Sequence, residues 1–309
     1  METRYIGAMS AGNTAALFNH RYLLESCIGR GGMGVVYQAT DQVSGDTVAL
    51  KVIREDLLQH EELLPRFRRE ARAASRIDSP HVTRVVDFGE DERGRPFLVM
   101  ELVQGPLLSH QLRQGPLEFP RALRILHQVA LGLDAAHRCQ VIHRDLKPGN
   151  VVLTTHRGET DHVKILDFGL AKILGSTTTS VVTPLGHTFG TAEYISPEQA
   201  RDQELDHRAD IYSFGVLAFE VLTGRVPFAG DTIEVVAAHV YRAPPSPRAL
   251  APTITAEMEQ LVLRCLAKRP EDRHASAAEL VGLLQPARAH GCAPLRSPES
   301  LPDSGRRDG

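Results

Sequence analysis

The sequence predicts an α+β protein built from a small sheet-rich unit followed by a larger, mainly helical one. The chain has 309 residues, of which 42% are hydrophobic and 24% charged, so it can bury a large hydrophobic core. Its length predicts roughly two domains or lobes. Residues 22 to about 103 alternate short β-prone runs with turn signals and contain one helical stretch near 62–76. From about residue 107 the apolar spacing becomes that of helices.

The β-prone runs of the first unit share Val, Ile, Tyr, Phe and Thr, the residue types that favour strands. They are YLLESCIG (22–29), VVYQAT (35–40), TVALKVI (47–53), RVVDFGE (84–90) and PFLVMEL (96–102).

The second unit is predicted to begin with a helix around Pro120, a residue suited to a first turn. Its apolar face would hold Leu123, Leu126, Ala130 and Leu133. Two strand-like runs, 151–155 and 163–168, are separated by the polar turn THRGETDH. The stretch IYSFGVLAFEVL (211–222) is too short for a membrane span and is predicted to be a buried core helix.

Composition argues against several classes of protein. The 35 basic and 38 acidic residues are mixed along the chain, so we expect no nucleic-acid partner. The four cysteines lack the paired spacing of a zinc site or a disulfide framework, which favours a reducing cytoplasmic location. The N-terminus lacks the apolar core of a secretion signal. We expect residues 1–20 and 286–309 to be mobile tails.

The stretch IGRGGMGVV fits the pattern G-x-G-x-x-G-x-V. A dinucleotide-binding turn would run from the glycines into a helix, but here a β-prone run follows. A hairpin whose glycines let backbone approach ATP phosphates is therefore favoured over an ordinary turn. The candidate nucleotide contacts are Ile28, Gly29, Arg30, Gly31, Gly32, Met33, Gly34, Val35 and Val36.

Lys51 lies in the apolar strand VALK, where an ammonium group is costly unless an anion meets it. Glu70 lies at helical spacing from Phe67, Ala71 and Ala74, near the inward face. We expect Glu70 to pair with Lys51, with a neighbouring arginine as the alternative partner.

The stretch VIHRDLKPGN (141–150) gathers five polar side chains in a segment too short for a helix. A zinc site using His137, Cys139 and His143 has no usual ligand spacing. Acyl transfer is disfavoured because no serine or cysteine lies in a nucleophile-elbow context. Phosphoryl transfer remains.

HRDLKPGN (143–150), DFG (167–169), VALK and the glycine loop occur in the order found in protein kinases, and the sequence resembles a bacterial, eukaryotic-like serine/threonine protein kinase over residues 22–285. The resemblance implies a two-lobed fold with an antiparallel-sheet N-lobe at about 21–101, a hinge at about 101–106 and a helical C-lobe at about 107–285. It also implies ATP as phosphoryl donor and Mg²⁺, or else Mn²⁺, as the metal.

The resemblance implies a role for each motif residue. Asp145 would accept or orient the proton of the substrate hydroxyl, and Lys147 would neutralise charge on the transferred group. Asn150 and Asp167 would hold the metal, which oxygen ligands suit. Lys51, held by Glu70, would contact the α- and β-phosphates.

The run FLVMELV resembles the strand entering the hinge of kinases. Met100 then occupies the gatekeeper position, and backbone groups of Glu101 and Val103 would meet the adenine edge. Ala49, two residues before Lys51, is a further expected nucleotide contact. A plain buried strand is the alternative interpretation.

About thirty hydroxyl-rich residues separate Asp167 from SPE (196–198) and resemble an activation segment. Arg144 would pair with a phosphate on that segment, so we expect control by autophosphorylation at Thr183, Thr188 or a neighbour. Thr191, with Lys147, points to serine or threonine substrates.

Glu198 is expected to pair with Arg273 in RPEDR, and Asp210 is expected to have an architectural role. Gly149 stands where kinases that prefer basic substrates often carry an acid, which weakens that specificity. The expected partners are protein substrates and, for autophosphorylation, a second copy of the chain. The rival functions are a pseudokinase scaffold and a small-molecule phosphotransferase.

Overall fold

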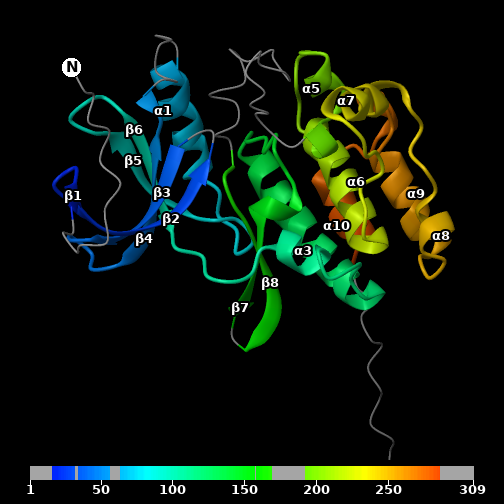
Figure 1. Ribbon diagram of the computed structural model, residues 1–309, viewed down its shortest axis with the longest axis horizontal. Helices are drawn as coiled ribbons and strands as arrows, with labels where there is room; N and C mark the ends of the chain where they lie inside the picture. Colours follow the sequence, from blue (N-terminus) through cyan, green and yellow to red (C-terminus); the bar gives the residue numbers. More distant parts are fainter. Residues whose placement is uncertain (1–15, 32–33, 56–62, 157, 169–191, 286–309) are drawn as a thin grey trace, which may run out of the picture.

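The computed structural model describes residues 16–31, 34–55, 63–156, 158–168 and 192–285. Figure 1 shows a sheet with one helix on one side of the molecule and a group of helices on the other. The elements of the sheet-bearing lobe are β1 (Ala16–Phe18), β2 (Tyr22–Gly31), β3 (Gly34–Asp41), β4 (Thr47–Ile53), α1 (Leu63–Ala74), β5 (Val85–Glu90) and β6 (Pro96–Glu101).

The six strands of this lobe form one antiparallel sheet in the order β1-β2-β3-β4-β6-β5. All five strands expected from the sequence are present, and the helical stretch is α1, so these predictions are confirmed. Phe67 and Ala71 of α1 are buried against Leu98 and Met100 of β6, which fixes the helix on one face of the sheet.

The sequence predicted a mobile tail over residues 1–20, and this prediction is wrong for its last residues. Ala16–Phe18 forms β1 and pairs with β2. The ring of Phe18 meets Phe97 edge to face with centroids 5.3 Å apart, and Tyr22 packs on the same ring. Three residues, Ala-Leu-Phe, are too few to show the alternation that predicts a strand, and β1 is stabilised by tertiary packing. The remaining tail residues, 1–15 and 286–309, lie outside the described residues.

The second lobe is mainly helical, as predicted. Its elements are α2 (Leu108–Leu112), α3 (Phe119–Arg138), η2 (Pro148–Asn150), β7 (Val151–His156), β8 (Glu159–Ile165), η3 (Ala192–Tyr194), α5 (Pro197–Ala200), α6 (Arg208–Thr223), α7 (Thr232–Tyr241), α8 (Pro247–Leu250), α9 (Ala256–Cys265), η4 (Pro270–Asp272) and α10 (Ala277–Leu283).

Two long helices carry the core of this lobe. Pro120 lies in the first turn of α3, and Leu126, Ala130 and Leu133 are fully buried, whereas Leu123 is only partly buried. Almost every residue of α6 is buried, which confirms the prediction of a core helix for 211–222. Within the described residues, no helix combines the length and apolar character that a membrane crossing requires.

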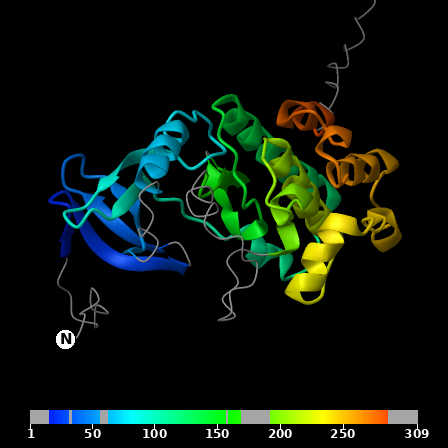
Figure 2. The ribbon, with the colours of Figure 1, turned by 90° about the horizontal axis from the view of Figure 1, so that it is seen from above.

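The hairpin β7–β8 lies between the two lobes (Figures 1 and 2). Its second strand was expected at 163–168 but runs from Glu159 to Ile165, because pairs such as Thr154 with His162 extend the ladder into the polar turn. The strand therefore ends before Asp167, and this residue is freed from sheet hydrogen bonding.

The segment after α1 ties the lobes together along β8. The amide of Ile165 donates to the His81 carbonyl at 2.9 Å, and the amide of Thr83 donates back to the Ile165 carbonyl at 2.9 Å. Lys164 of β8 reaches Glu101 at the end of β6, with Nζ 2.5 Å from Oε1. The lobes are thus joined beside the chain that leads to Asp167.

Candidate active site

The backbone at the start of segment 143–150 is hydrogen-bonded to one buried carboxylate. Asp210 of α6 is fully buried and accepts hydrogen bonds from the amides of His143 and Arg144, each at 2.8 Å. His137 lies 2.8 Å from the same carboxylate. Burial alone would raise the pKa of Asp210, but the contact with His137 and the amide hydrogen bonds lower it. A charged Asp210 therefore anchors the loop, and its predicted architectural role is confirmed.

Two site residues adopt the left-handed backbone conformation. Arg144 has φ 68° and Asp167 has φ 59°, which is unfavourable for residues other than glycine. The Asp210 carboxylate holds the amide of Arg144. Next to Asp167, the Leu166 carbonyl lies 2.8 Å from Nε2 of His143, and the Leu166 amide donates to Asn150. These contacts fix the directions in which the two loops project their side chains.

Asp145, Lys147 and Asn150 converge within this loop. Nζ of Lys147 lies 2.8 Å from Oδ2 of Asp145. Nδ2 of Asn150 donates to the Asp145 carbonyl at 2.7 Å and lies 3.2 Å from its Oδ2. Because the amide nitrogen of Asn150 is used in this way, its oxygen is the group left to bind a cation. The carboxylate of Asp145, the ammonium of Lys147 and the side-chain amide of Asn150 therefore lie in contact within one loop.

Lys51 on β4 crosses to the second lobe and meets Asp167, with Nζ 2.9 Å from Oδ1. Only 7% of the Lys51 side chain is exposed, so the strand lysine is buried and paired with an anion as expected. The partner differs from the prediction. Among the contacts between described residues, Glu70 lies 3.6 Å from Arg69, and no Lys51–Glu70 ion pair is formed.

The reason for this difference is geometric. Glu70 is 8% exposed and lies on the inward side of α1, as expected. Asp167 competes for the same ammonium from the other lobe, and its left-handed backbone turns the carboxylate toward β4. In this structure Lys51 therefore pairs with Asp167, the candidate metal ligand, rather than with Glu70 of α1.

The glycines of the β2–β3 hairpin differ in how much space a side chain would have at each position. A Cβ on Gly34 would lie 2.1 Å from the Val52 carbonyl oxygen, so β3 can approach β4 only with glycine there. Gly29 has room for a Cβ, with its nearest neighbour at 3.8 Å, and Gly31 faces open space. Gly32 and Met33 lie outside the described residues.

The other hairpin residues flank these glycines. Ile28 is 48% exposed, and Arg30 pairs with Val35 across the β2–β3 ladder. Val36 lies opposite Lys51 in the β3–β4 ladder.

The expected hinge residues lie at the end of β6. Met100 is buried beside Ala49 of β4, its cross-strand partner. The Glu101 amide donates to the Arg84 carbonyl at 3.0 Å, so it is already used within the sheet. Val103 follows the strand and is partly exposed.

A hollow of about 370 Å³ lies beside the catalytic-loop candidate. Its lining includes Ser109, Leu112, Arg113, Lys147, Tyr194 and Glu220. The Tyr194 hydroxyl donates to Glu220, whose pKa is raised by burial. This pocket could not be predicted from the sequence, because its lining residues come from α2, η2, η3, α6 and the residues next to them.

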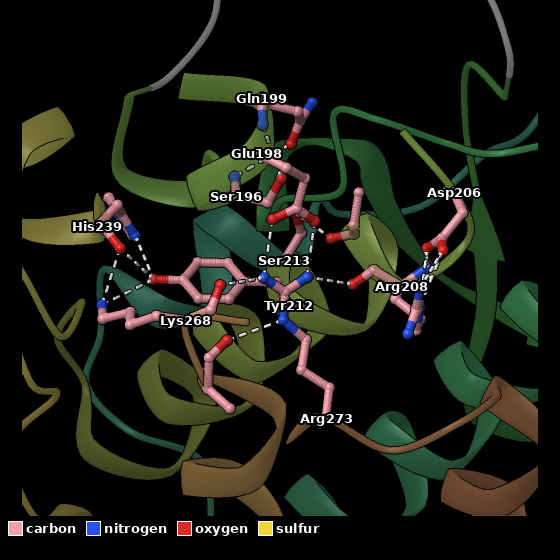
Figure 3. A network of polar contacts seen from close by, with 12 residues as sticks. Ser196, Glu198, Gln199, Asp206, Arg208, Tyr212, Ser213, His239, Lys268 and Arg273 are labelled. Atoms are coloured by element: carbon pink, nitrogen blue, oxygen red, sulfur yellow. Dashed lines mark hydrogen bonds and ion pairs between the residues drawn. The ribbon is translucent and has the colours of Figure 1, made fainter. Parts of the chain in front are cut away.

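The predicted pair of Glu198 with Arg273 is confirmed (Figure 3). The guanidinium makes two hydrogen bonds to the carboxylate, at 2.7 and 2.8 Å, and both side chains are buried. Ser196 caps α5 in a reciprocal arrangement with Gln199. Nε2 of Gln199 also donates to the Arg144 carbonyl at 2.8 Å, which connects α5 to the catalytic loop.

Arg144 is enclosed, and burial lowers its pKa while Glu70 and Asp210 act in the opposite direction. The threonines expected to accept regulatory phosphate, Thr183 and Thr188, and the expected substrate-platform Thr191 lie outside the described residues. Sequence reasoning missed His137 as a partner of Asp210 and Lys164 as a partner of Glu101. In both pairs the partners are more than sixty residues apart, with no local pattern connecting them.

Comparison with known proteins identifies the family of this chain. A family model described as "Protein kinase domain" matches residues 22–282. The chain is 44% identical over 291 residues to serine/threonine-protein kinase pkn3 of Myxococcus xanthus, covering 91% of this chain and 53% of the relative. It is 40% identical to PknE of Mycobacterium bovis, covering 84% of this chain and 44% of that protein. The chain thus spans about half the length of these curated relatives.

Solved structures agree with these relatives. The crystal structure of the Mycobacterium tuberculosis PknI kinase domain superposes with a TM-score of 0.69 at 27% identity, covering 89% of this chain and 98% of that one. Rad53 in complex with AMP-PNP gives 0.67 at 25% identity, with 84% and 64% covered. Sequence motifs, lobe arrangement and relatives lead to one conclusion: the chain belongs to the protein kinase family, in its bacterial, eukaryotic-like serine/threonine branch.

Proposed function

We propose that this chain transfers the γ-phosphoryl group of ATP to serine or threonine hydroxyls of proteins. The observation that carries the proposal is the convergence of Asp145, Lys147 and Asn150 in one loop. Phosphoryl transfer needs positioned charges around the transferred group more than a strong nucleophile, and this loop supplies them. Membership in the protein kinase family supports ATP as donor.

In this proposal, Asp145 holds the acceptor hydroxyl and takes its proton as the oxygen attacks phosphorus. Lys147, now 2.8 Å from that carboxylate, neutralises charge that develops on the phosphoryl oxygens. Lys51 binds the α- and β-phosphates. If a metal held by Asp167 displaced the lysine from that carboxylate, Glu70 would be the anion expected to orient it. The carboxylate of Asp145 thus accepts a proton, and the two lysines bind anionic oxygens.

The donor set suits Mg²⁺ or Mn²⁺. Asp167 offers a carboxylate and Asn150 an amide oxygen, both hard ligands of the kind these ions prefer. When bound, the ion would supply positive charge at the phosphates. The chain's own contribution is to orient the two ligands, through the Leu166 amide donating to the Asn150 carbonyl at 2.9 Å.

The nucleotide base is proposed to lie against the hinge. Because the Glu101 amide is used by Arg84, its carbonyl is the group proposed to meet adenine, together with the backbone of Val103. Ala49 and Met100 would contact the ring, and the hairpin residues 28–36 would cover the phosphates.

Regulation by autophosphorylation is part of the proposal. Arg144 is enclosed beside Asp210, and its Nε is buried without a hydrogen-bond partner among the described residues. A phosphate on Thr183 or Thr188 would give this guanidinium a strong anionic partner. Mass spectrometry after incubation with ATP tests this, and phosphate-free peptides covering 172–191 would contradict it.

Transfer to proteins is separated from its rivals by labelled ATP. The wild-type chain should label casein or histone and leave aminoglycosides unlabelled. Labelling of aminoglycosides alone would favour a small-molecule phosphotransferase. ATP binding with no transfer to any acceptor would favour a pseudokinase scaffold. A reducing cytoplasmic location is proposed from the cysteine spacing.

A further inference from the structure

Lysine is rare in this chain, and the lysines that the structure describes all lie at buried or partly buried positions. Five of the 35 basic residues are lysines: Lys51, Lys147, Lys164, Lys172 and Lys268. Lys172 lies outside the described residues, and none of the other four is exposed. Among lysine and arginine side chains in the described part of the chain, the exposed ones are arginines, and the four described lysines are buried or partly buried.

Three of these lysines meet a carboxylate at close range. Lys51 and Lys147 contact site residues at 2.9 and 2.8 Å, and Lys164 contacts the hinge at 2.5 Å. The side chains of these three lysines are 7%, 22% and 17% exposed, so each ammonium lies close to an anion in a partly enclosed position. The fourth enclosed lysine, Lys268, follows α9 and forms no ion pair with a carboxylate among the described residues.

Lys268 is bound to the C-terminal end of α7 (Figure 3). Its Nζ donates to the carbonyls of His239 and Ala238 at 2.8 and 3.3 Å. It also lies 4.6 Å from the centre of the Phe228 ring, where a cation is attracted. Last-turn carbonyls form the negative end of a helix dipole, so the ammonium anchors this end of α7.

α7 connects Lys268 to the hollow beside Lys147. The imidazole of His239 bonds the Tyr212 hydroxyl at 2.9 Å and is itself buried. The same helix packs against η3, which ends at Tyr194. Tyr194 lines the hollow beside Lys147, and Ser213 of α6 holds its carbonyl at 2.8 Å. The position of α7 therefore bears on the wall of the pocket.

The groups around Lys268 have well-separated titration ranges. Burial, and then the charges of Arg273 and Arg201, lowers the pKa of Lys268 to about 8. Burial raises the pKa of Tyr212 on α6, and burial together with Lys268 lowers the pKa of His239 on α7 to about 4.

The neighbouring carboxylate, Glu198 of α5, is paired with Arg273. Between pH 7 and 9, Lys268 is thus the member of this group whose charge changes.

We propose that Lys268 is a positioning residue for the protein substrate. Its ammonium fixes the C-terminal end of α7, and α7 in turn holds η3 with Tyr194 at the pocket beside Lys147. The inference rests on the proposed function, since it names a residue that acts on the protein substrate of that reaction.

The test compares Lys268→Met and Lys268→Arg with the wild type, using casein as acceptor. A matched control is Arg269→Met, because Arg269 is the adjacent residue, is exposed and pairs only with Glu271 among the described residues. KM for casein, KM for ATP and kcat are measured at pH 7 and pH 9, and thermal unfolding reports on folding.

Removing the ammonium should raise KM for casein about tenfold at pH 7, with KM for ATP within about twofold of wild type. In the wild type, KM for casein should rise between pH 7 and pH 9 as the amine loses its proton. Lys268→Arg, which stays charged, should lack this rise. Arg269→Met should behave as the wild type does.

A wild-type KM for casein in Lys268→Met would overturn the inference, as would a parallel rise in KM for both substrates that tracks a lower unfolding midpoint. Failure of the wild type to label casein would overturn the proposed function and this inference with it. Labelling with an unchanged KM in Lys268→Met would overturn only the inference.

Discussion

The ammonium of Lys51 lies 2.9 Å from the carboxylate of Asp167, so a strand of one lobe is tied to the start of the DFG segment in the other. Among the described residues, Lys51 forms no ion pair with Glu70, the partner that the sequence suggested. Because Asp167 is also a metal-ligand candidate, a metal would compete with Lys51 for this carboxylate, and nucleotide phosphates would compete with Asp167 for the lysine.

Replacing Lys51 with methionine should lower kcat/KM for ATP by about a hundredfold or more, since one preorganised cation at the phosphates is lost. Steady-state transfer to casein at varied ATP measures this. Lys51→Arg is the control that keeps the charge but changes its geometry, and it should recover only part of the activity. A decrease smaller than about threefold in the methionine variant would contradict a phosphate-binding role.

Gly34→Ala should be far more damaging than Gly29→Ala, although both glycines belong to the same motif. The new Cβ at residue 34 would lie 2.1 Å from the Val52 carbonyl oxygen, whereas at residue 29 the nearest atom is 3.8 Å away. We expect Gly34→Ala to raise KM for ATP about tenfold or more by forcing β3 away from β4. Equal effects of the two substitutions would contradict this account.

Arg273→Met should destabilise the protein by about 3–5 kcal/mol, because it leaves the Glu198 carboxylate buried without its cation. Urea unfolding followed by circular dichroism measures the change. The exposed pair of Arg269 with Glu271 provides the comparison, and Arg269→Met should change stability by less than about 1 kcal/mol. Similar small losses in both variants would show that the buried pair is not a structural anchor.

His239 predicts a pH dependence of stability. Burial, with a contribution from Lys268, lowers its pKa in the folded protein to about 4, whereas an unfolded histidine titrates near about 6.5. The unfolded chain therefore binds the proton more readily, so stability from neutral His239 is complete above about pH 6.5 and is lost as the pH falls toward 4.

His239→Gln should remove this contribution and reduce the slope of unfolding free energy against pH by up to about 1.4 kcal/mol per unit in that window. Denaturant titrations at several pH values between 4 and 7 measure the slope. A slope unchanged from wild type would mean that His239 binds its proton equally well in the folded and the unfolded chain, which would contradict the lowered pKa.

The sequence predicted those parts of the site that are local. Asp145, Lys147 and Asn150 lie within six residues and belong to one motif that resembles the kinase catalytic loop, and the structure joins their side chains by short contacts. Strands such as Thr47–Ile53 were equally clear, since dense β-branched residues leave few alternatives. The core helix α6 followed from its continuous apolar run.

Contacts between distant segments could not be predicted in the same way. The exchange of Glu70 for Asp167 as partner of Lys51 depends on the left-handed backbone at Asp167, which no composition rule signals. Lys164 with Glu101 and Lys268 with α7 depend on how lobes and helices pack. β1 was missed because its stability comes from Phe18 packing on Phe97 rather than from its own sequence.

The measurement that tests the central claim most directly is transfer of labelled phosphate from ATP to casein by the wild type and by Asp145→Asn, with ATP binding measured in parallel. The account predicts that the variant binds ATP as the wild type does and loses about a thousandfold or more in transfer rate, because the acceptor hydroxyl has no carboxylate to take its proton. Labelling by Asp145→Asn at the wild-type rate would contradict the account.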